Sequence, residues 1–185
     1  GANIIGISDR VPTNPAHYKL IEENINKDFR IDIRDIESLQ KIIIDEAPDF
    51  IFHLAAQPIV LKSYESPMET FSINAMGTAN ILESIRMTNH KCSVVMITSD
   101  KCYDNVERNF GYLESDRLGG KDPYSGSKGA AELIIRSYVN SFFSSENSNI
   151  KLGIGRAGNV IGGGDWAKHR IIPDCIRSWS KNKKP

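Results

Sequence analysis

Two short stretches of this 185-residue chain carry side chains whose types and spacing suit acid–base chemistry. Tyr124 and Lys128 are four residues apart in a Tyr-Ser-Gly-Ser-Lys segment, a spacing that puts both on one face of a helix. A tyrosine is a poor base at neutral pH, but a neighbouring ammonium favours its phenolate. Tyr124 is therefore a candidate base for an alcohol or sugar hydroxyl. Taken alone, Tyr-x-x-x-Lys also fits an ordinary helix surface.

The second stretch is Ser99-Asp100-Lys101, which follows the apolar run 94–97. A hydroxyl, a carboxyl and an amine at a strand end can supply a hydrogen bond to a developing oxyanion, a general acid and a general base. Two requirements oppose this interpretation. The adjacent ammonium favours the ionised form of Asp100, and Lys101 must be desolvated to act as a base. The alternative for Asp100 and Lys101 is a solvated loop pair.

Alternating strand and helix patterns must position these two stretches. Strands are expected at residues 3–8, 29–33, 50–54, 93–98 and 151–157, and helices at 36–45, 67–87, 123–144 and 173–180. This alternation predicts an α/β fold, a doubly wound parallel sheet of the Rossmann type with helices on both faces. Ligands of such folds bind outside the carboxyl ends of the strands, where both stretches fall.

A dinucleotide-binding unit also has a Gly-rich loop between its first strand and first helix, and this sequence has no such loop. Residues 3–8 end at Ser8-Asp9, which is typical of a second strand. We therefore expect a piece of a longer protein that lacks strand 1, its Gly-rich loop and most of a C-terminal substrate domain. Residues 1–158 are then a partial dinucleotide-binding domain, and residues 159–185 begin a substrate-binding region.

The composition narrows the possible partners and locations. Lys plus Arg and Asp plus Glu both number 23, so charge gives no argument for a nucleic-acid or membrane partner. The three cysteines and four histidines lack metal-ligand spacing, and we expect no metal. Few and scattered cysteines, with no apolar run of membrane-spanning length, favour the reducing cytoplasm.

Five motifs in order resemble the extended short-chain dehydrogenase/reductase family along nearly the whole chain. They are Asp32-Ile33, the His-Leu-Ala-Ala-Gln run 53–57, the Asn-Ala-Met-Gly-Thr run 74–78, the strand end at 98–101, and Tyr124 with Lys128. Each motif alone also fits a structural role. The resemblance implies a bound NAD, although Arg10 leaves NADP open. It implies that the cofactor contacts Ser8, Asp9, Asp32, Ile33, Leu54, Ala55, Ala56, Thr98, Tyr124 and Lys128.

Within that family, the runs 98–105, 119–128, 156–166 and 172–174 resemble the CDP-glucose 4,6-dehydratases. Related sugar-nucleotide dehydratases carry Thr-Asp-Glu where this chain has Ser99, Asp100 and Lys101. The resemblance implies that Tyr124 deprotonates the sugar 4-hydroxyl, Lys128 holds the nicotinamide ribose, Ser99 binds the 4-oxygen and Asp100 is the general acid. Lys101 is then the base at carbon 5 or stabilises the enolate. Gln57 and Asn159 are expected to contact the substrate.

The implied function is a redox-neutral dehydration of CDP-glucose to CDP-4-keto-6-deoxyglucose with tightly bound NAD+. One alternative is an epimerase, reductase or dehydratase that acts on a UDP, dTDP or GDP sugar. Another is an inactive fragment or a domain that serves only in assembly. The resemblance also implies a homodimer or higher homo-oligomer, which would pack the helices expected at 67–87 and 123–144.

Overall fold

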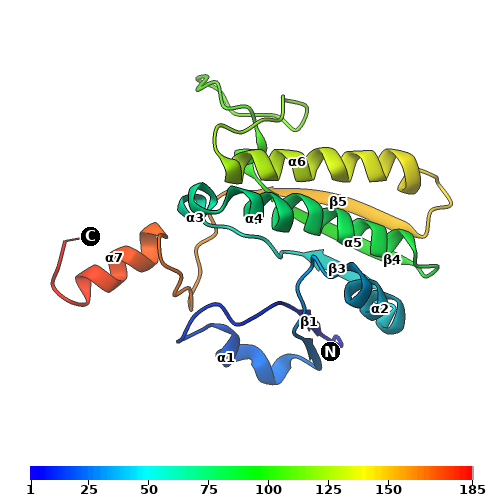
Figure 1. The fold of residues 1–185 in the computed structure, drawn as a ribbon, viewed down its shortest axis with the longest axis horizontal. Helices are drawn as coiled ribbons and strands as arrows, with labels where there is room; N and C mark the ends of the chain where they lie inside the picture. The colour runs from blue at the N-terminus through cyan, green and yellow to red at the C-terminus, as the bar shows by residue number, and fades with distance from the viewer. Residues whose placement is uncertain (185) are drawn as a thin grey trace. The chain divides into compact units, whose positions relative to one another are not determined.

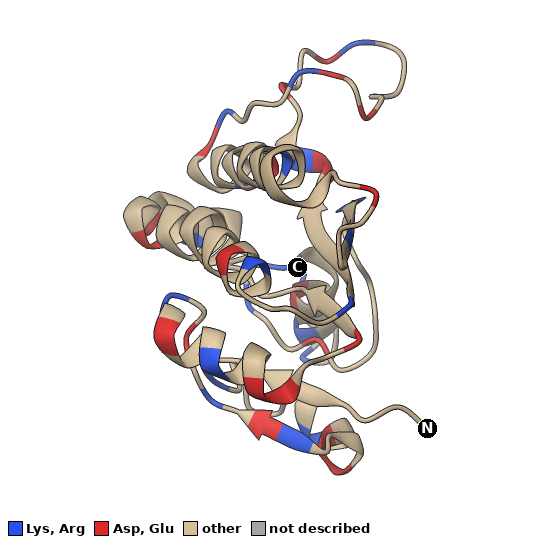
Figure 2. Cartoon of the chain, turned by 90° about the vertical axis from the view of Figure 1, so that its right-hand side faces the viewer, with Lys and Arg blue, Asp and Glu red and all other residues tan. Residues whose placement is uncertain are grey.

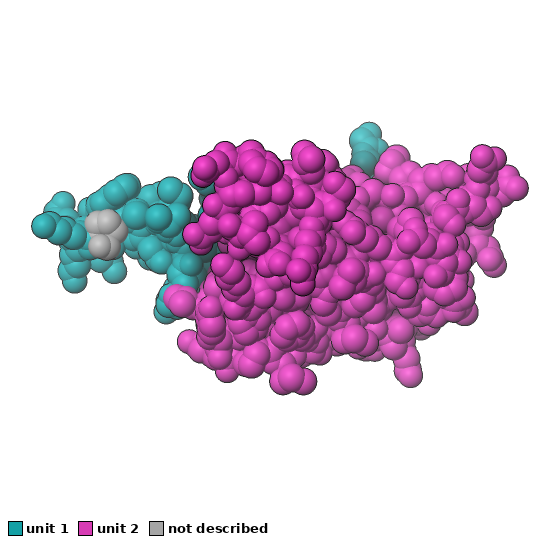
Figure 3. Space-filling view, turned by 90° about the horizontal axis from the view of Figure 1, so that it is seen from above, with its two compact units in different colours: residues 1–32, 159–185 teal, residues 33–158 magenta. Residues whose placement is uncertain are grey.

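The computed structural model describes residues 1–184, which divide into two compact units (Figure 3). The first unit contains residues 1–32 and the segment that starts at residue 159. The second unit contains residues 33–158. Each unit is described by itself below.

A parallel three-stranded sheet forms the centre of the second unit (Figure 1). Its strands are β3 (Phe50–His53), β4 (Cys92–Ser99) and β5 (Ile150–Ala157), in the order β3-β4-β5. His53 pairs with Met96 and Ser99 pairs with Ala157, so β4 and β5 extend three residues beyond the end of β3. Because the strands are parallel, their carboxyl ends lie at one edge of the sheet.

Five helices accompany this sheet: α2 (Ile36–Glu46), α3 (Val60–Glu65), α4 (Pro67–Phe71), α5 (Gly77–Arg86) and α6 (Pro123–Tyr138). A π-helical turn at Ser72–Met76 joins α4 to α5, and another at Val139–Phe143 continues α6. Helix α6 starts where it does because the Asp122 carboxylate accepts a hydrogen bond from Ser125 N at 3.0 Å, and Pro123 suits the first turn.

The core of the second unit lies between the sheet and helices α5 and α6. Val94 and Met96 of β4 are buried there with Leu82, Ile85 and Ile135. Helix α2 packs against α5 through Leu39 and Ile43. The other face of β3 is open within this unit, where Phe50 and Phe52 are 66% and 63% exposed.

The first unit has a parallel pair of short strands, β1 (Ile5–Ile7) and β2 (Lys27–Phe29). Helix α1 (Tyr18–Ile21) lies between them in sequence, and α7 (Ile171–Trp179) belongs to the later segment. The Tyr18 hydroxyl donates a 2.6 Å hydrogen bond to Asp28, which fixes α1 to β2. Figure 2 shows acidic and basic residues on several elements of the chain, with neither sign confined to one part of it.

The predicted α/β fold with parallel strands is confirmed. Both sheets are parallel, with the orders β1-β2 in the first unit and β3-β4-β5 in the second. Some details were wrong. The second strand lies at 27–29 rather than 29–33, because residues from Arg30 leave the ladder. Helices α1 and α3 were missed, and the described residues of the second unit leave one face of β3 uncovered.

Within residues 1–184 we find no helix with the length and apolar character needed to span a membrane.

Candidate active site

The turn that ends β4 places the hydroxyl, carboxyl and amine of the sequence motif together. This β4 turn, residues 99–102, is a single 3₁₀ turn in which the Ser99 hydroxyl accepts from Lys101 N at 3.2 Å and donates to Asp100 Oδ1 at 3.1 Å. The Lys101 ammonium lies 3.7 Å from the same carboxylate oxygen. Ser99 is buried, whereas the Asp100 and Lys101 side chains are 52% and 40% exposed. The two charged groups therefore meet water in this structure.

The first turns of α6 carry the second motif. Tyr124 and Lys128 are both buried, at 9% and 7% exposed, and they lie one turn apart on the same helix. Burial lowers the pKa of the Lys128 ammonium below its usual range. Helix α6 packs against the β4 turn, so both motifs lie at the carboxyl edge of the sheet.

Asn74 fixes the loop after β3 against the start of α6. It lies in the π-helical turn, where its amide accepts from Gln57 N at 2.8 Å and donates to Gln57 O at 3.1 Å. The same amide donates to the Ser127 hydroxyl at 2.9 Å, and that hydroxyl donates to Tyr124 O at 2.7 Å. The backbone around Tyr124 is thereby tied to the sheet edge.

The Gln57 side chain is used inside the protein. Its amide accepts from Ile59 N at 2.7 Å and donates to Ile59 O and Thr70 Oγ1, each at 3.1 Å. Gln57 is 4% exposed, so in this structure it shapes the loop. Its expected contact with a substrate stays a prediction. Ala55 and Ala56 are half-buried and Leu54 is exposed along the same loop.

His53, at the end of β3, is a buried histidine held in its neutral form. The Thr78 hydroxyl donates to Asn74 O, so it accepts from His53 Nε2 at 3.2 Å, which assigns the proton to that nitrogen. Burial, reinforced by the nearby Lys128 ammonium, lowers the pKa of His53 to about 4.

This pKa has a consequence for stability. Between pH 6.5 and about 4 the unfolded chain binds a proton at His53 that the folded protein does not bind. The His53 contribution is therefore fully present above pH 6.5 and falls by about 3 kcal/mol as the pH drops to 4. We expect wild type to lose more unfolding free energy over that window than His53→Gln, as measured by urea unfolding.

His169→Gln is the matched control, because His169 is exposed and its loss should leave the pH profile unchanged. A His53 ring that titrates near pH 6.5 by NMR would contradict the prediction.

The remaining predicted cofactor contacts in the second unit are packed inside it. Ile33 is buried against Gly77, and its carbonyl accepts from Asn80 at 3.0 Å. The Thr98 hydroxyl donates to Glu132 Oε1 at 2.6 Å, so that hydroxyl is engaged in the core. Their contacts with a cofactor stay predictions.

Ser8, Asp9, Asp32 and Asn159 belong to the first unit. The Ser8 hydroxyl donates to Arg10 O at 3.0 Å, and the Arg10 guanidinium lies 3.6 Å from the Asp9 carboxylate at the end of β1. Asp32 is half-buried and Asn159 is exposed.

Glu132 is a residue that the motif analysis missed. It is completely buried in α6, where Arg156 of β5 binds both of its carboxylate oxygens, at 2.9 and 3.0 Å. The sequence does contain a pattern that indicates its position. Tyr124, Lys128 and Glu132 follow one another at intervals of four residues, so Glu132 shares a helix face with the two motif residues.

The residues around Tyr124 fit a polar ligand with hydroxyl groups. Within residues 1–184 the largely buried Lys128 ammonium makes no hydrogen bond or ion pair, so it can donate to an acceptor on a ligand. A ribose hydroxyl would supply that acceptor. The same residues contain no group of three or more His, Cys, Asp or Glu side chains placed to hold a metal.

A parallel sheet with a tyrosine and a lysine at its carboxyl edge defines a Rossmann-type domain of the dehydrogenase/reductase class. Comparison with protein families narrows this class. Residues 5–151 match the family model described as GDP-mannose 4,6 dehydratase. The chain belongs to this family of nucleotide-sugar dehydratases, within the extended short-chain dehydrogenases/reductases that its motifs resemble.

A curated relative supports this assignment, and two solved structures have the same fold. The CDP-glucose 4,6-dehydratase of Salmonella typhimurium is 47% identical over 188 residues, which cover 100% of this chain and 52% of that protein. A dTDP-glucose 4,6-dehydratase from Streptomyces venezuelae, solved with NAD bound, superposes with a TM-score of 0.83 at 21% identity, covering 97% of this chain and 53% of that one. A UDP-glucuronic acid 4-epimerase from Bacillus cereus gives 0.81 at 22%, covering 98% and 56%. The chain thus spans about half the length of these proteins.

Proposed function

We propose that this chain is the cofactor-side part of a redox-neutral CDP-glucose 4,6-dehydratase that uses bound NAD+. The observation that carries the proposal is the joint placement of Tyr124, Lys128 and the β4 turn at the carboxyl edge of the sheet. The 47% identity to a CDP-glucose 4,6-dehydratase over the whole chain supports the choice of substrate. The buried thiols Cys92 and Cys102 are free, which suits a reducing cytoplasm.

The first chemical task falls to α6. Tyr124 takes the proton of the sugar 4-hydroxyl, and Lys128 stabilises the phenolate and donates hydrogen bonds to the nicotinamide ribose. Ser99 Oγ donates to the oxygen at carbon 4 as it becomes a carbonyl. When bound, NAD+ would accept the hydride from carbon 4 and later return it to carbon 6.

The second task is the loss of water, which falls to Asp100 and Lys101. A ketone at carbon 4 makes the proton at carbon 5 acidic. Lys101 removes that proton or stabilises the enolate, while Asp100 protonates the hydroxyl that leaves carbon 6 as water; a proton returns to carbon 5 when the hydride is added to carbon 6. Both side chains are exposed here, so water must be excluded from them when the substrate binds before these roles can be filled. Their present ion pair would then open toward the sugar.

The direct test is incubation of the full-length protein with NAD+ and CDP-glucose, followed by mass spectrometry. A product lighter by one water supports the proposal. Unchanged mass with altered stereochemistry would instead support an epimerase. Loss of water only from a dTDP, UDP or GDP sugar would contradict the proposed substrate, CDP-glucose, but would still support dehydration as the reaction.

Lys101→Met separates the two tasks. We expect it to slow dehydration by about 10²-fold or more, because a proton-transfer group at carbon 5 is lost, while oxidation at carbon 4 proceeds. Reduced cofactor should therefore accumulate during a single turnover, as measured by its absorbance. Lys41→Met on the exposed face of α2 is the control and should turn over normally. If Lys101→Met dehydrates at the wild-type rate, Lys101 is not part of the reaction.

A further inference from the structure

Glu132 and Arg156 form a charged pair inside the second unit, behind the β4 turn. Glu132 is 0% exposed, and the Arg156 side chain is 11% exposed. Burial on its own would raise the pKa of Glu132, but hydrogen bonds from Arg156 and Thr98 outweigh it and hold the pKa below its usual value. The pair is therefore ionised. A buried ion pair seldom adds stability over apolar packing, so its presence calls for another reason.

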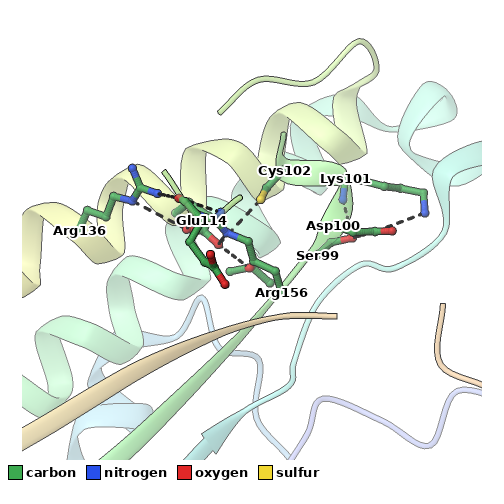
Figure 4. Close-up of polar contacts among 9 residues, drawn as sticks. Ser99, Asp100, Lys101, Cys102, Glu114, Arg136 and Arg156 are labelled. Atoms are coloured by element: carbon green, nitrogen blue, oxygen red, sulfur yellow. Dashed lines mark hydrogen bonds and ion pairs between the residues drawn. The ribbon is translucent and has the colours of Figure 1, made fainter. Parts of the chain in front are cut away.

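The Glu132 carboxylate contacts the residue before the β4 turn and the last residue of the turn. Its Oε1 accepts from the Thr98 hydroxyl at 2.6 Å, directly before Ser99, and from the Cys102 thiol at 3.9 Å, directly after Lys101. Figure 4 shows the Cys102 sulfur pointing toward the Arg156 side chain. Ser99, Asp100 and Lys101 lie on the opposite side of Cys102. One side chain thus anchors both ends of the segment that carries the three polar groups.

Arg156 extends the same anchor to the loop after the β4 turn. Its third nitrogen, Nη1, donates to Glu114 O at 3.1 Å, and its guanidinium lies over the Tyr103 ring at 4.7 Å. Arg136 of α6 also donates to Glu114 O, at 3.2 Å, as Figure 4 shows. The planar guanidinium uses all three of its nitrogens and one face, a geometry that a lysine cannot reproduce.

We propose that Glu132 and Arg156 are positioning residues that fix the β4 turn relative to the Tyr124 face of α6. Glu132 belongs to the same helix face as Tyr124 and Lys128, and its carboxylate reaches the residues that bracket Ser99, Asp100 and Lys101. The inference rests on the proposed dehydration and adds two residues that act without touching the substrate. A purely structural role for the pair is the competing explanation.

Four variants of the full-length protein distinguish a positioning role of the pair from a purely structural one. Glu132→Gln leaves Arg156 without its counter-charge, and Arg156→Gln leaves Glu132 with only the more distant Arg136 guanidinium at 4.0 Å, so both variants should fold less stably. Glu132→Gln/Arg156→Gln removes both charges and should recover much of the melting temperature. Arg156→Lys keeps the charge but loses the two-pronged contact. Positioning predicts that kcat for dehydration stays 10- to 100-fold below wild type in all four, with KM changed less than about threefold.

The matched control is Glu22→Gln, which removes a carboxylate from an exposed ion pair in the first unit and should change neither quantity. A double variant whose kcat returns to within twofold of wild type would show that the pair serves stability alone and would overturn the proposal.

Backbone amide hydrogen exchange gives a readout that does not depend on activity. In the double variant we expect the amides of residues 99–103 to exchange at least tenfold faster, with those of β3 unchanged. Equal exchange would overturn the positioning role. If wild type fails to dehydrate any nucleotide sugar but the exchange result holds, the proposed function fails while the mechanical role of the pair stands.

Discussion

Tyr124→Phe is expected to lower kcat for dehydration by about 10³-fold, since it removes the phenolic oxygen that takes the proton of the sugar 4-hydroxyl. Tyr124 is buried at the start of α6, so the ring keeps its packing and only the oxygen is lost. The melting temperature should change by less than a few degrees. Steady-state formation of the 4-keto product, measured together with thermal unfolding, checks both parts.

Tyr64→Phe provides the control, because Tyr64 is 62% exposed on α3 and its hydroxyl has no part in the proposed chemistry. A Tyr124→Phe enzyme that keeps more than a tenth of wild-type kcat would rule Tyr124 out as the base. A variant that unfolds at the assay temperature would be replaced by Lys128→Met, which should lower the same step through loss of the supporting ammonium.

Gly120→Ala is expected to have the largest effect on stability. A Cβ at this position would lie 2.3 Å from Gly126 N and 2.4 Å from Ser125 C, and both are backbone atoms of α6 that cannot turn aside. The backbone at Gly120 also has a φ of 157°, a conformation that L side chains rarely adopt. We expect the free energy of unfolding to fall by about 3 kcal/mol or more, as measured by urea unfolding.

The same substitution should lower activity in the fraction that folds, because relief of the clash moves the first turn of α6 and Tyr124 with it. Gly111→Ala lies in the same loop, where an added Cβ meets nothing within 4 Å, and should leave stability nearly unchanged. Equal stabilities for the two variants would show that the contact between Gly120 and α6 does not constrain the loop.

Local patterns predicted the elements that hold the site. The apolar run before Ser99 predicted β4, and Pro123 predicted the start of α6, because both signals act within a few residues. The Tyr124-Lys128 spacing placed both side chains on one face, which the structure confirms. The alternating pattern and the family motifs then predicted that these separate segments lie at one edge of a parallel sheet.

Contacts between distant segments could not be predicted in this way. Asn74 reaches Ser127 across 53 residues, and Glu132 reaches Arg156 across 24, and no local periodicity encodes which polar groups will meet. The hydrogen bonds of the Gln57 amide to Ile59 and Thr70 are a further example, since nothing in the local sequence indicates them. The exposure of Asp100 and Lys101 likewise depends on what surrounds them in space.

The π-helical turn between α4 and α5 sets the rotational phase of the two helices. Each residue of an α-helix advances by about 100°, so removing one residue from Ser72–Met76 would rotate α4 by roughly that angle relative to α5. Thr70, now buried against the Gln57 amide, would turn away from it. A π-helical turn holds one residue more than the matching α-helical turn, and this residue shifts the rotational phase of α4 relative to α5. As a result, α4 contacts the loop after β3 through Thr70, whereas α5 packs into the core.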